Sequence, residues 1–230
     1  MIHQRVKDVL FSGAYLLGWP MYLVARITYG FRARRGETFA LHLGCGPEYI
    51  DGMVNVDGNL FRQIDLWHDL RRRLPFPDRS VHFVYSCHTL EHLYPDAAFR
   101  LLCEIERVLS PGSVARIAVP SLEHALTIAA GRAESRWPRS FDGSRAQAIN
   151  YLFCDGQHRY GYSADLLREI SEETGLRVSE VEGPLTSKRE SYEYRGYRIP
   201  PEPAGSLVVD LRQVNPDHDS EEKIRSTATG

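Results

Sequence analysis

The sequence predicts an α/β domain built around a mostly parallel β-sheet. Strand-like apolar segments alternate with helix-like segments over most of the 230 residues, which is the pattern of such domains. Two of the strand-like segments end in residues suited to ligand binding, the first in Gly44-Cys45-Gly46 and the second in Asp57. Ligands of parallel sheets bind at the carboxyl ends of the strands, so a binding site is expected at that edge.

The first part of the domain contains four expected strands and one amphipathic helix. The strands are short apolar runs at residues 39–43, 53–56, 64–67 and 81–85, of which the third is the weakest. Pro95 suits the first turn of the helix, and Ser110-Pro111-Gly112 is expected to stop it. The apolar face of the helix recurs at helical spacing and consists of Leu101, Leu102, Ile105, Val108 and Leu109.

The second part is expected to add three strands, at residues 114–119, 177–181 and 207–214. Residues 122–162 are less regular, and residues 131–143 have the character of an inserted loop that could form a lid. Ser163 is an N-cap for a further helix, and Gly175 stands where a left-handed residue ends it.

Composition and charge describe an ordinary globular protein. Hydrophobic residues make up 43% of the chain, and a formal net charge of −2 gives no global attraction to nucleic acid. No stacking platform or base-flipping pocket is indicated either, so we expect no nucleic-acid partner. The four cysteines are scattered without a C-x-x-C pair, which favours reduced thiols in the cytoplasm.

The N-terminal segment, residues 1–35, is distinct from the domain. Residues 9–25 carry no charge, and arginines 26, 32, 34 and 35 follow them. The run is at the lower limit for a membrane-spanning helix, and Pro20 interrupts it. We favour a helix that lies on the inner membrane surface. A helix packed on the domain or on a second copy in a homodimer, and a true span, remain open. The domain then covers residues 36–214, and residues 215–230 form a polar tail.

The glycines and the carboxylate suit S-adenosyl-L-methionine better than a dinucleotide. A dinucleotide-binding loop needs a third glycine where Tyr49 stands, so a nicotinamide oxidoreductase is a weak alternative. Asp57 at the tip of the second strand can accept hydrogen bonds from both ribose hydroxyls, while Gly44 and Gly46 leave room for the methionine end. Asp69 and Leu70 offer one polar and one apolar contact to adenine.

Residues 41–123 resemble a class I S-adenosylmethionine-dependent methyltransferase. Four segments match in order, and a fifth is similar to a bacterial branch of this family: "LHLGCG", "VNVDGN", "HDLRRRLPFPDRSVHFVYSCHTLEHL", "EIERVLSPGSVARIAVPS" and "HRYGYSADLLREISEETGL". The resemblance implies a Rossmann-like, seven-stranded, mostly parallel sheet with flanking helices and an antiparallel last strand.

The resemblance also assigns residues to the cofactor. It implies that Gly44, Cys45 and Gly46 form the loop at the methionine end and that Asp57 binds the ribose. Asp69 and Leu70 would border the adenine, and Ser86 to His88 would lie near the sulfonium. One departure concerns the first crossover: only eight residues separate Gly44 from Met53, so the usual first helix must be nearly absent.

The chemistry of a hydroxyl acceptor adds four candidate residues. A base helps to remove the hydroxyl proton, and His158 is the first candidate and His88 the second. Arg159 and Tyr160, beside His158, are candidates for binding the acceptor.

A zinc-hydrolase pattern is present but not favoured. "HTLEH", residues 88–92, fits H-x-x-E-H, in which two histidines bind zinc and the glutamate acts as base. Because it directly follows a buried strand, we expect Leu90 and Leu93 to pack under the sheet and Glu91 and His92 to form hydrogen bonds. No metal site is therefore predicted.

The sequence thus predicts a cytoplasmic S-adenosylmethionine-dependent methyltransferase. Its acceptor is expected to be an oxygen of a glycan, a lipid-linked compound or a small molecule. The alternative is a methyltransferase-like domain that has lost catalysis and serves as a binding scaffold.

Overall fold

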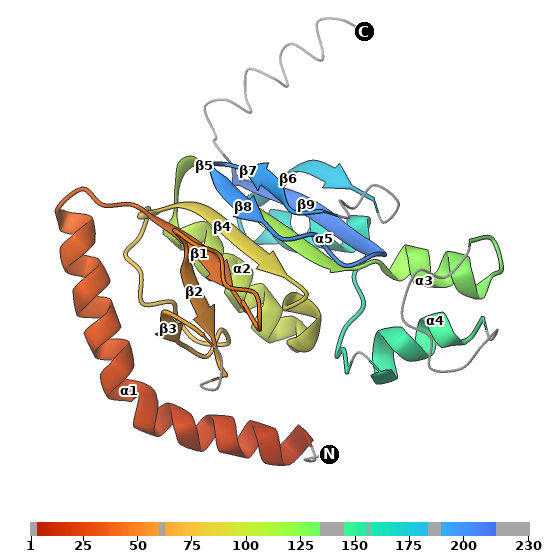
Figure 1. Ribbon diagram of the computed structural model, residues 1–230, viewed down its shortest axis with the longest axis horizontal. Helices are drawn as coiled ribbons and strands as arrows, with labels where there is room; N and C mark the ends of the chain where they lie inside the picture. Colours follow the sequence, from red (N-terminus) through yellow and green to blue (C-terminus); the bar gives the residue numbers. More distant parts are fainter. Residues whose placement is uncertain (1–3, 60–62, 134–144, 156, 184–189, 215–230) are drawn as a thin grey trace, which may run out of the picture.

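The computed structural model describes residues 4–59, 63–133, 145–155, 157–183 and 190–214, with the side chains of residues 4–18 and 155 left out. A seven-stranded sheet forms its centre (Figure 1). In spatial order its strands are β3 (Leu66–Trp67), β2 (Val54–Asp57), β1 (Phe39–Leu43), β4 (Val81–Cys87), β5 (Leu109–Pro120), β9 (Ser206–Gln213) and β6 (Leu176–Glu182).

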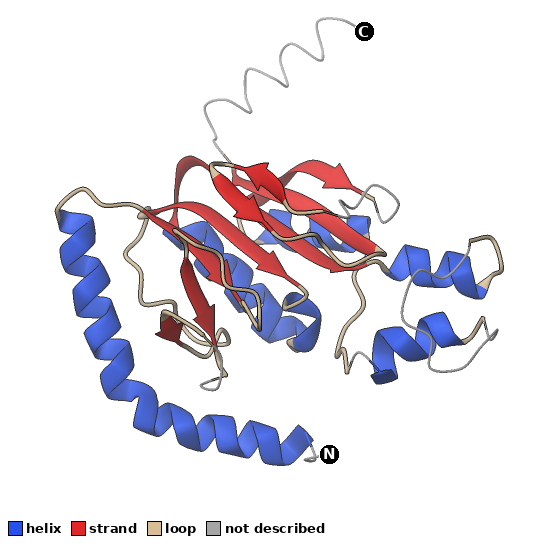
Figure 2. Ribbon diagram, in the orientation of Figure 1, coloured by secondary structure: helices blue, strands red, loops and turns tan. Residues whose placement is uncertain are grey.

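The helices lie around this sheet (Figure 2). Two short helical turns, η1 (Leu90–His92) and η2 (Tyr151–Asp155), accompany the longer ones. The α-helices are α1 (Gln4–Arg34), α2 (Pro95–Val108), α3 (Leu122–Ala129), α4 (Gln147–Asn150) and α5 (Ala164–Glu173).

The predicted fold class is confirmed. Strands β1 to β5 pair in parallel, and β9, the last strand of the described residues, runs antiparallel to both β5 and β6. Ser163 caps α5 by accepting a hydrogen bond from the Leu166 amide at 3.1 Å, and Gly175 follows the helix with φ of +84°. The apolar face predicted for α2 is buried in the main core.

Two local expectations were wrong. Helix α2 ends at Val108, and β5 begins at once because Leu109 pairs with Val81, so Ser110-Pro111-Gly112 lie inside the strand. The hairpin of β7 (Tyr192–Tyr194) and β8 (Tyr197–Ile199) was not predicted. The lid predicted at residues 131–143 falls largely outside the described residues, as does the polar tail at 215–230.

No helix connects β1 to β2, as the short spacing indicated. The side chain of Asn55, on β2 and fully buried, holds this link in place of a helix. Its Oδ1 accepts from the Ile50 amide at 2.9 Å, and its Nδ2 is shared among the carbonyls of Ile50 and Met53 and the carboxylate of Asp65. One amide side chain therefore satisfies the backbone polar groups of a buried connection.

The β7–β8 hairpin covers the sheet beside this link. Its tyrosines 192, 194 and 197 pack on a core cluster that includes Ile50, Met53 and Phe83. Arg195 and Gly196 both have positive φ, 54° and 83°, as the two-residue turn of a tight hairpin requires. The hairpin thus buries apolar surface beside the β1–β2 link, where no connecting helix is present to cover it.

A buried arginine ties the hairpin to the sheet. Arg116 on β5 is 1% exposed and donates to Asp210 on β9 at 2.9 Å. It also donates to the Tyr192 hydroxyl at 2.9 Å and to Glu182 at 2.5 Å. This buried charge is therefore paired with carboxylates, and each of its three guanidinium nitrogens donates a hydrogen bond, as its burial requires.

The C-terminal half of α1 packs on the domain. Tyr22, Ala25 and Tyr29 are buried, and the Tyr29 ring contacts the rings of Phe39 and Phe76. Within the described part of the chain, no helix has the length and apolar character needed to cross a membrane. Ala25 and Tyr29 of α1 therefore belong to the main core of the domain.

Asn55 is expected to be essential for stability. Asn55→Ala leaves several buried backbone groups without partners, each of which costs about 1–3 kcal/mol. We expect the free energy of unfolding to fall by about 2–4 kcal/mol in urea denaturation. The exposed Asn150→Ala is the matched control and should change it by less than about 0.5 kcal/mol. Equal stabilities for the two variants would contradict this role.

Stability is also expected to fall in mild acid through His42. Burial lowers the pKa of this histidine to about 4, so the folded state holds it neutral. The unfolded state binds the proton at higher pH, near 6.5, so stability is lost as pH falls from about 6.5 towards 4. We expect His42→Gln to reduce this loss by roughly 1–3 kcal/mol, measured by urea unfolding at pH 7.5 and 4.5. An unchanged pH dependence would rule His42 out as the cause.

Candidate functional site

A cavity of about 360 Å³ opens at the carboxyl ends of β1, β2 and β4. This volume is within the range of small-molecule sites. Its walls combine glycines, imidazoles and carboxylates with apolar side chains. The lining residues are Gly44, Gly46, Asp57, Gly58, Asn59, His68, Asp69, Leu70, Arg71, His88, Thr89, His92, Leu93 and Arg159.

The two glycines of the first loop have different roles. Gly44 has φ of +69°, and a Cβ on it would lie 2.1 Å from Oγ1 of Thr89, so glycine is needed for packing between β1 and the segment after β4. Gly46 has φ of +53°, and a Cβ on it would meet no atom within 4 Å. Only Gly46 therefore presents bare backbone with open space beside it, where a ligand can approach closely.

Asp57 keeps part of its carboxylate available to a ligand. One oxygen accepts from the Gly46 amide at 2.9 Å, and the other accepts from the Asn59 amide at 2.7 Å. A carboxylate has about four acceptor positions, so each oxygen can accept one further hydrogen bond. The two backbone contacts fix the carboxylate at the cavity wall, next to the glycine loop.

Asp69 and Leu70 both line the cavity, but the Asp69 carboxylate is already engaged. Arg71 binds it with two side-chain hydrogen bonds of 2.8 Å. Burial opposes ionisation, yet these hydrogen bonds and the Arg71 charge hold the pKa of Asp69 below its usual value. Leu70 and the neighbouring His68, which sequence reasoning missed, supply the less polar part of this wall.

Two residues assigned to the cofactor lie behind the wall. Ser86 is buried, and its hydroxyl donates to the Leu43 carbonyl at 2.9 Å, which joins β4 to β1. Cys45 is buried as well, and burial raises the pKa of its thiol to about 12. The cavity lining includes neither residue, so both positions shape the loop from behind.

Of the two histidines expected as base, only His88 lines the cavity. Its Nε2 lies 2.8 Å from Oγ of Ser206, and the Ser206 hydroxyl donates to the Pro203 carbonyl at 2.6 Å. Since that hydroxyl has one proton, His88 must donate through Nε2, which leaves a lone pair on Nδ1. Burial, with smaller contributions from the charges of His158 and His92, lowers the pKa of His88 to about 4.

His158 lies behind the cavity wall, and its side chain is 5% exposed. Burial lowers its pKa to about 4. Its neighbour Arg159 does line the cavity and stacks over the Tyr94 ring at 4.3 Å. Tyr160 packs against Tyr162 and is not among the cavity residues. Within the predicted acceptor group, the structure thus brings only Arg159 to the cavity.

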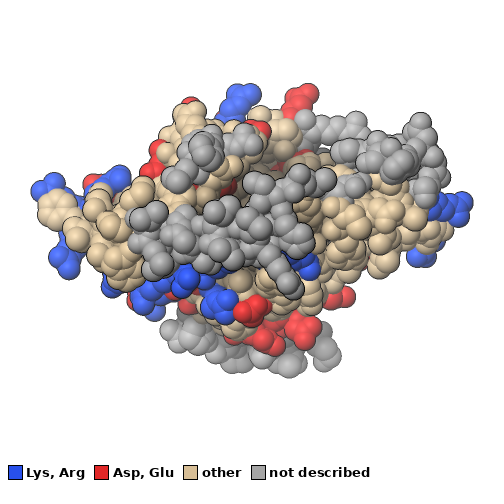
Figure 3. Space-filling model, turned by 90° about the horizontal axis from the view of Figure 1, so that it is seen from below, with Lys and Arg blue, Asp and Glu red and all other residues tan. Residues whose placement is uncertain are grey.

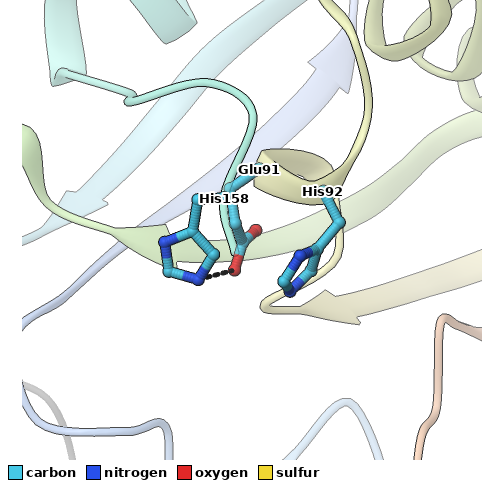
Figure 4. Close-up of side chains that lie close together, drawn as sticks. All are labelled: Glu91, His92 and His158. Carbon is cyan, nitrogen blue, oxygen red and sulfur yellow. Dashed lines mark ion pairs between the residues drawn. The ribbon is translucent and has the colours of Figure 1, made fainter. Parts of the chain in front are cut away.

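The expectation that the Glu91 side chain forms hydrogen bonds was wrong. Its backbone carbonyl accepts from the amides of Arg159 and Tyr160, but within the described residues neither carboxylate oxygen has a hydrogen-bond partner. The Glu91 side chain is buried and lies between the side chains of His92 and His158 (Figure 4). Burial raises the pKa of Glu91 to about 8.

Six other lining residues were not assigned to the site from the sequence: Gly58, Asn59, Arg71, Thr89, His92 and Leu93. Each of them lies within two residues of a position that the sequence analysis had named, so closeness along the chain could have indicated them.

The glycines give a test of this geometry. Gly44→Ala places a Cβ against Thr89 and a side chain at positive φ, so we expect it to destabilise the fold by about 3 kcal/mol. Gly46→Ala meets only the backbone penalty and should cost about 1 kcal/mol. Urea unfolding of both variants measures the difference, and an equal cost would contradict the close contact of Gly44 with Thr89.

Comparison with known proteins supports the topology. Residues 48–117 match the model of a methyltransferase domain family. A search of curated proteins gave no match. The methyltransferase solved in complex with the Trm112 activator of Haloferax volcanii is 18% identical, with a TM-score of 0.51 over 78% of this chain and 84% of that one.

Methyltransferases of Mesorhizobium loti and Archaeoglobus fulgidus, described as S-adenosylmethionine-dependent, also align. They are 15% and 17% identical, with TM-scores of 0.48 and 0.49. They cover 77% and 82% of this chain, and 91% and 94% of their own. The domain match and the observed strand order lead to one identification. The chain has the Rossmann-like methyltransferase fold, and residues 48–117 within it match a methyltransferase domain family.

Proposed function

We propose that the protein transfers a methyl group from S-adenosyl-L-methionine to an oxygen of its acceptor. One observation carries the proposal: Asp57 stands at the tip of β2 with unused acceptor positions, directly beside the bare backbone of Gly46. A vicinal diol is the ligand group that matches such a carboxylate, because both hydroxyls can donate to it.

The remaining cavity residues fit the other parts of this cofactor. His68 and Leu70 would border the adenine. Gly46 would lie against the amino-acid end, where the open space beside it accommodates backbone contact with the ligand. His88, Thr89 and Leu93 would surround the region of the sulfonium, since they follow β4 at the centre of the sheet.

When bound, the cofactor supplies a methyl group on a good leaving group, so the protein's main task is to align the acceptor and exclude water. Arg159 lines the cavity with a cation that can orient a polar acceptor. His88 remains the candidate base for a hydroxyl proton, since its ring lines the cavity and its low pKa keeps it neutral at pH 7.

The surface of α1 supports a glycan or lipid-linked acceptor at the inner membrane face. Val24, Ile27 and Phe31 recur at helical spacing on the side opposite the buried Tyr22 and Tyr29, and Ile27 is 70% exposed. Exposed arginines accompany this apolar stripe, and basic side chains gather at the end of the molecule where α1 joins the domain, at the left of Figure 3. An apolar stripe with basic neighbours is typical of a helix that binds anionic lipid surfaces.

Cofactor binding tests the proposal directly. We expect isothermal titration calorimetry to detect S-adenosylmethionine binding, and Asp57→Asn to weaken it on the order of 10- to 100-fold through loss of charge-assisted hydrogen bonds. The matched control is Asp51→Asn, the same substitution at an exposed position in the β1–β2 link, and it should bind the cofactor like the parent. The proposal fails if the parent does not bind, or if Asp57→Asn binds equally well.

The membrane contact has a separate test. The triple change of Val24, Ile27 and Phe31 to Ser should abolish co-sedimentation with vesicles that contain anionic phospholipid, because it removes the apolar stripe but leaves the arginines. The matched control changes the exposed Leu126 and Val181 to Ser. A parent protein that stays in the supernatant contradicts membrane contact, and a concentration-dependent dimer in analytical ultracentrifugation would assign the stripe to a homodimer instead.

A further inference from the structure

Three side chains from two separate segments converge behind the cavity wall. Glu91 and His92 belong to η1, directly after β4, and His158 lies in the loop after η2 (Figure 4). The figure shows the Glu91 carboxylate between the two imidazole rings. One ligand atom from each residue lies within 4.8 Å of the others.

The buried carboxylate of this group lacks hydrogen-bond partners among the described residues. The side chains of Glu91 and His158 are 1% and 5% exposed. Among the residues that the structure describes, neither carboxylate oxygen of Glu91 has a hydrogen-bond partner, and the nitrogen of His158 that faces this carboxylate is Nε2. A carboxylate taken out of water without hydrogen bonds is costly, so it is expected to hold either a proton or a cation.

The spacing fits a shared ion better than direct contact. Nε2 of His158 lies 3.9 Å from Oε1 of Glu91, and Nδ1 of His88 lies 3.6 Å from the same oxygen. Both distances are too long for a hydrogen bond. Ligands bound to one tetrahedral ion at about 2.0–2.1 Å are themselves roughly 3.4 Å apart, so small side-chain movements would suffice.

The tautomer of His88 points in the same direction. Because Nε2 of His88 donates to Ser206, its Nδ1 carries a lone pair, and this lone pair faces an oxygen of Glu91. Two acceptors that face each other repel unless a proton or a cation lies between them.

We propose that Glu91, His92 and His158 bind a divalent first-row transition-metal ion. Two imidazoles and one carboxylate are a ligand set that suits Zn²⁺ and its neighbours in the series, not Mg²⁺ or Ca²⁺. This arrangement differs from the zinc-hydrolase pattern, because the glutamate is a ligand and not a base, and one histidine comes from a distant segment.

The ion would lie at the cavity wall. His88 and His92 line the cavity, so an open coordination position there is accessible to water or to an oxygen of a bound molecule. This step rests on the proposed function: an ion at the cavity wall would favour acceptors whose hydroxyl group can bind a metal. Metal binding itself does not depend on that function and is measured without any cofactor.

The test uses the full chain, freed of any affinity tag and dialysed against a chelator. Titration with Co²⁺ should give the d–d absorption of a bound ion at one equivalent, and Zn²⁺ should displace it. Glu91→Gln and His158→Gln should each weaken Co²⁺ binding at least 10-fold. His82→Gln, which removes an exposed histidine that contacts Tyr197, is the matched control and should bind like the parent.

Three results would overturn the proposal: no stoichiometric uptake by the parent, equal uptake by both ligand variants, or a cobalt–thiolate band that assigns the ion to a cysteine such as the exposed Cys154. Circular dichroism melts show whether each variant folds, and His92→Gln, at an exposed position, supplies a ligand variant that is less disruptive to the core. S-adenosylmethionine calorimetry on the same samples separates the two proposals, because loss of metal binding with retained cofactor binding rejects only the metal site.

Discussion

The buried amide of Asn55 is the contact on which the geometry of the cavity depends. It satisfies the backbone of the link between β1 and β2, which is too short for the helix usually found at a parallel crossover. With the link fixed, the Gly46 amide meets the carboxylate of Asp57 at the end of the same strand. The position of the glycine loop relative to the carboxylate therefore follows from one side chain two residues before Asp57.

The absence of a first helix has a second consequence, on the sheet surface beside the link. Apolar residues such as Phe83 and Met53 would be left uncovered there, and the tyrosines of the β7–β8 hairpin bury them. The hairpin precedes β9, and Arg116 joins it to the strands at the far side of the sheet. The β7–β8 hairpin thus covers the part of the sheet that lies beside the helix-free link between β1 and β2.

The cavity has two chemically different sides. The side formed by Gly46 and Asp57 offers open backbone and a carboxylate with unused acceptor positions. The side that follows β4 brings histidines together with a buried carboxylate, Glu91, that has no hydrogen-bond partner among the described residues. In the proposed function the first side holds the cofactor, and the second side faces the acceptor.

By itself, the sequence determined the parts of the structure that depend on local pattern. Apolar runs, the Ser163 cap and Gly175 located most of the strands and α5, and the spacing between Gly44 and Met53 indicated a link without a helix. The positions of Gly46, Asp57 and Leu70 at the cavity followed as well, because the carboxyl ends of parallel strands meet at one edge.

Only the tertiary structure decided which distant residues meet. Ser86 and Cys45 turn inward, and His158 joins Glu91 and His92 behind the wall instead of lining the cavity. The sequence of the β7–β8 hairpin has no clear strand pattern, and its strands are stabilised by the packing of its tyrosines on the sheet. Side-chain direction and long-range pairing depend on packing between segments far apart in the chain, and no local pattern encodes them.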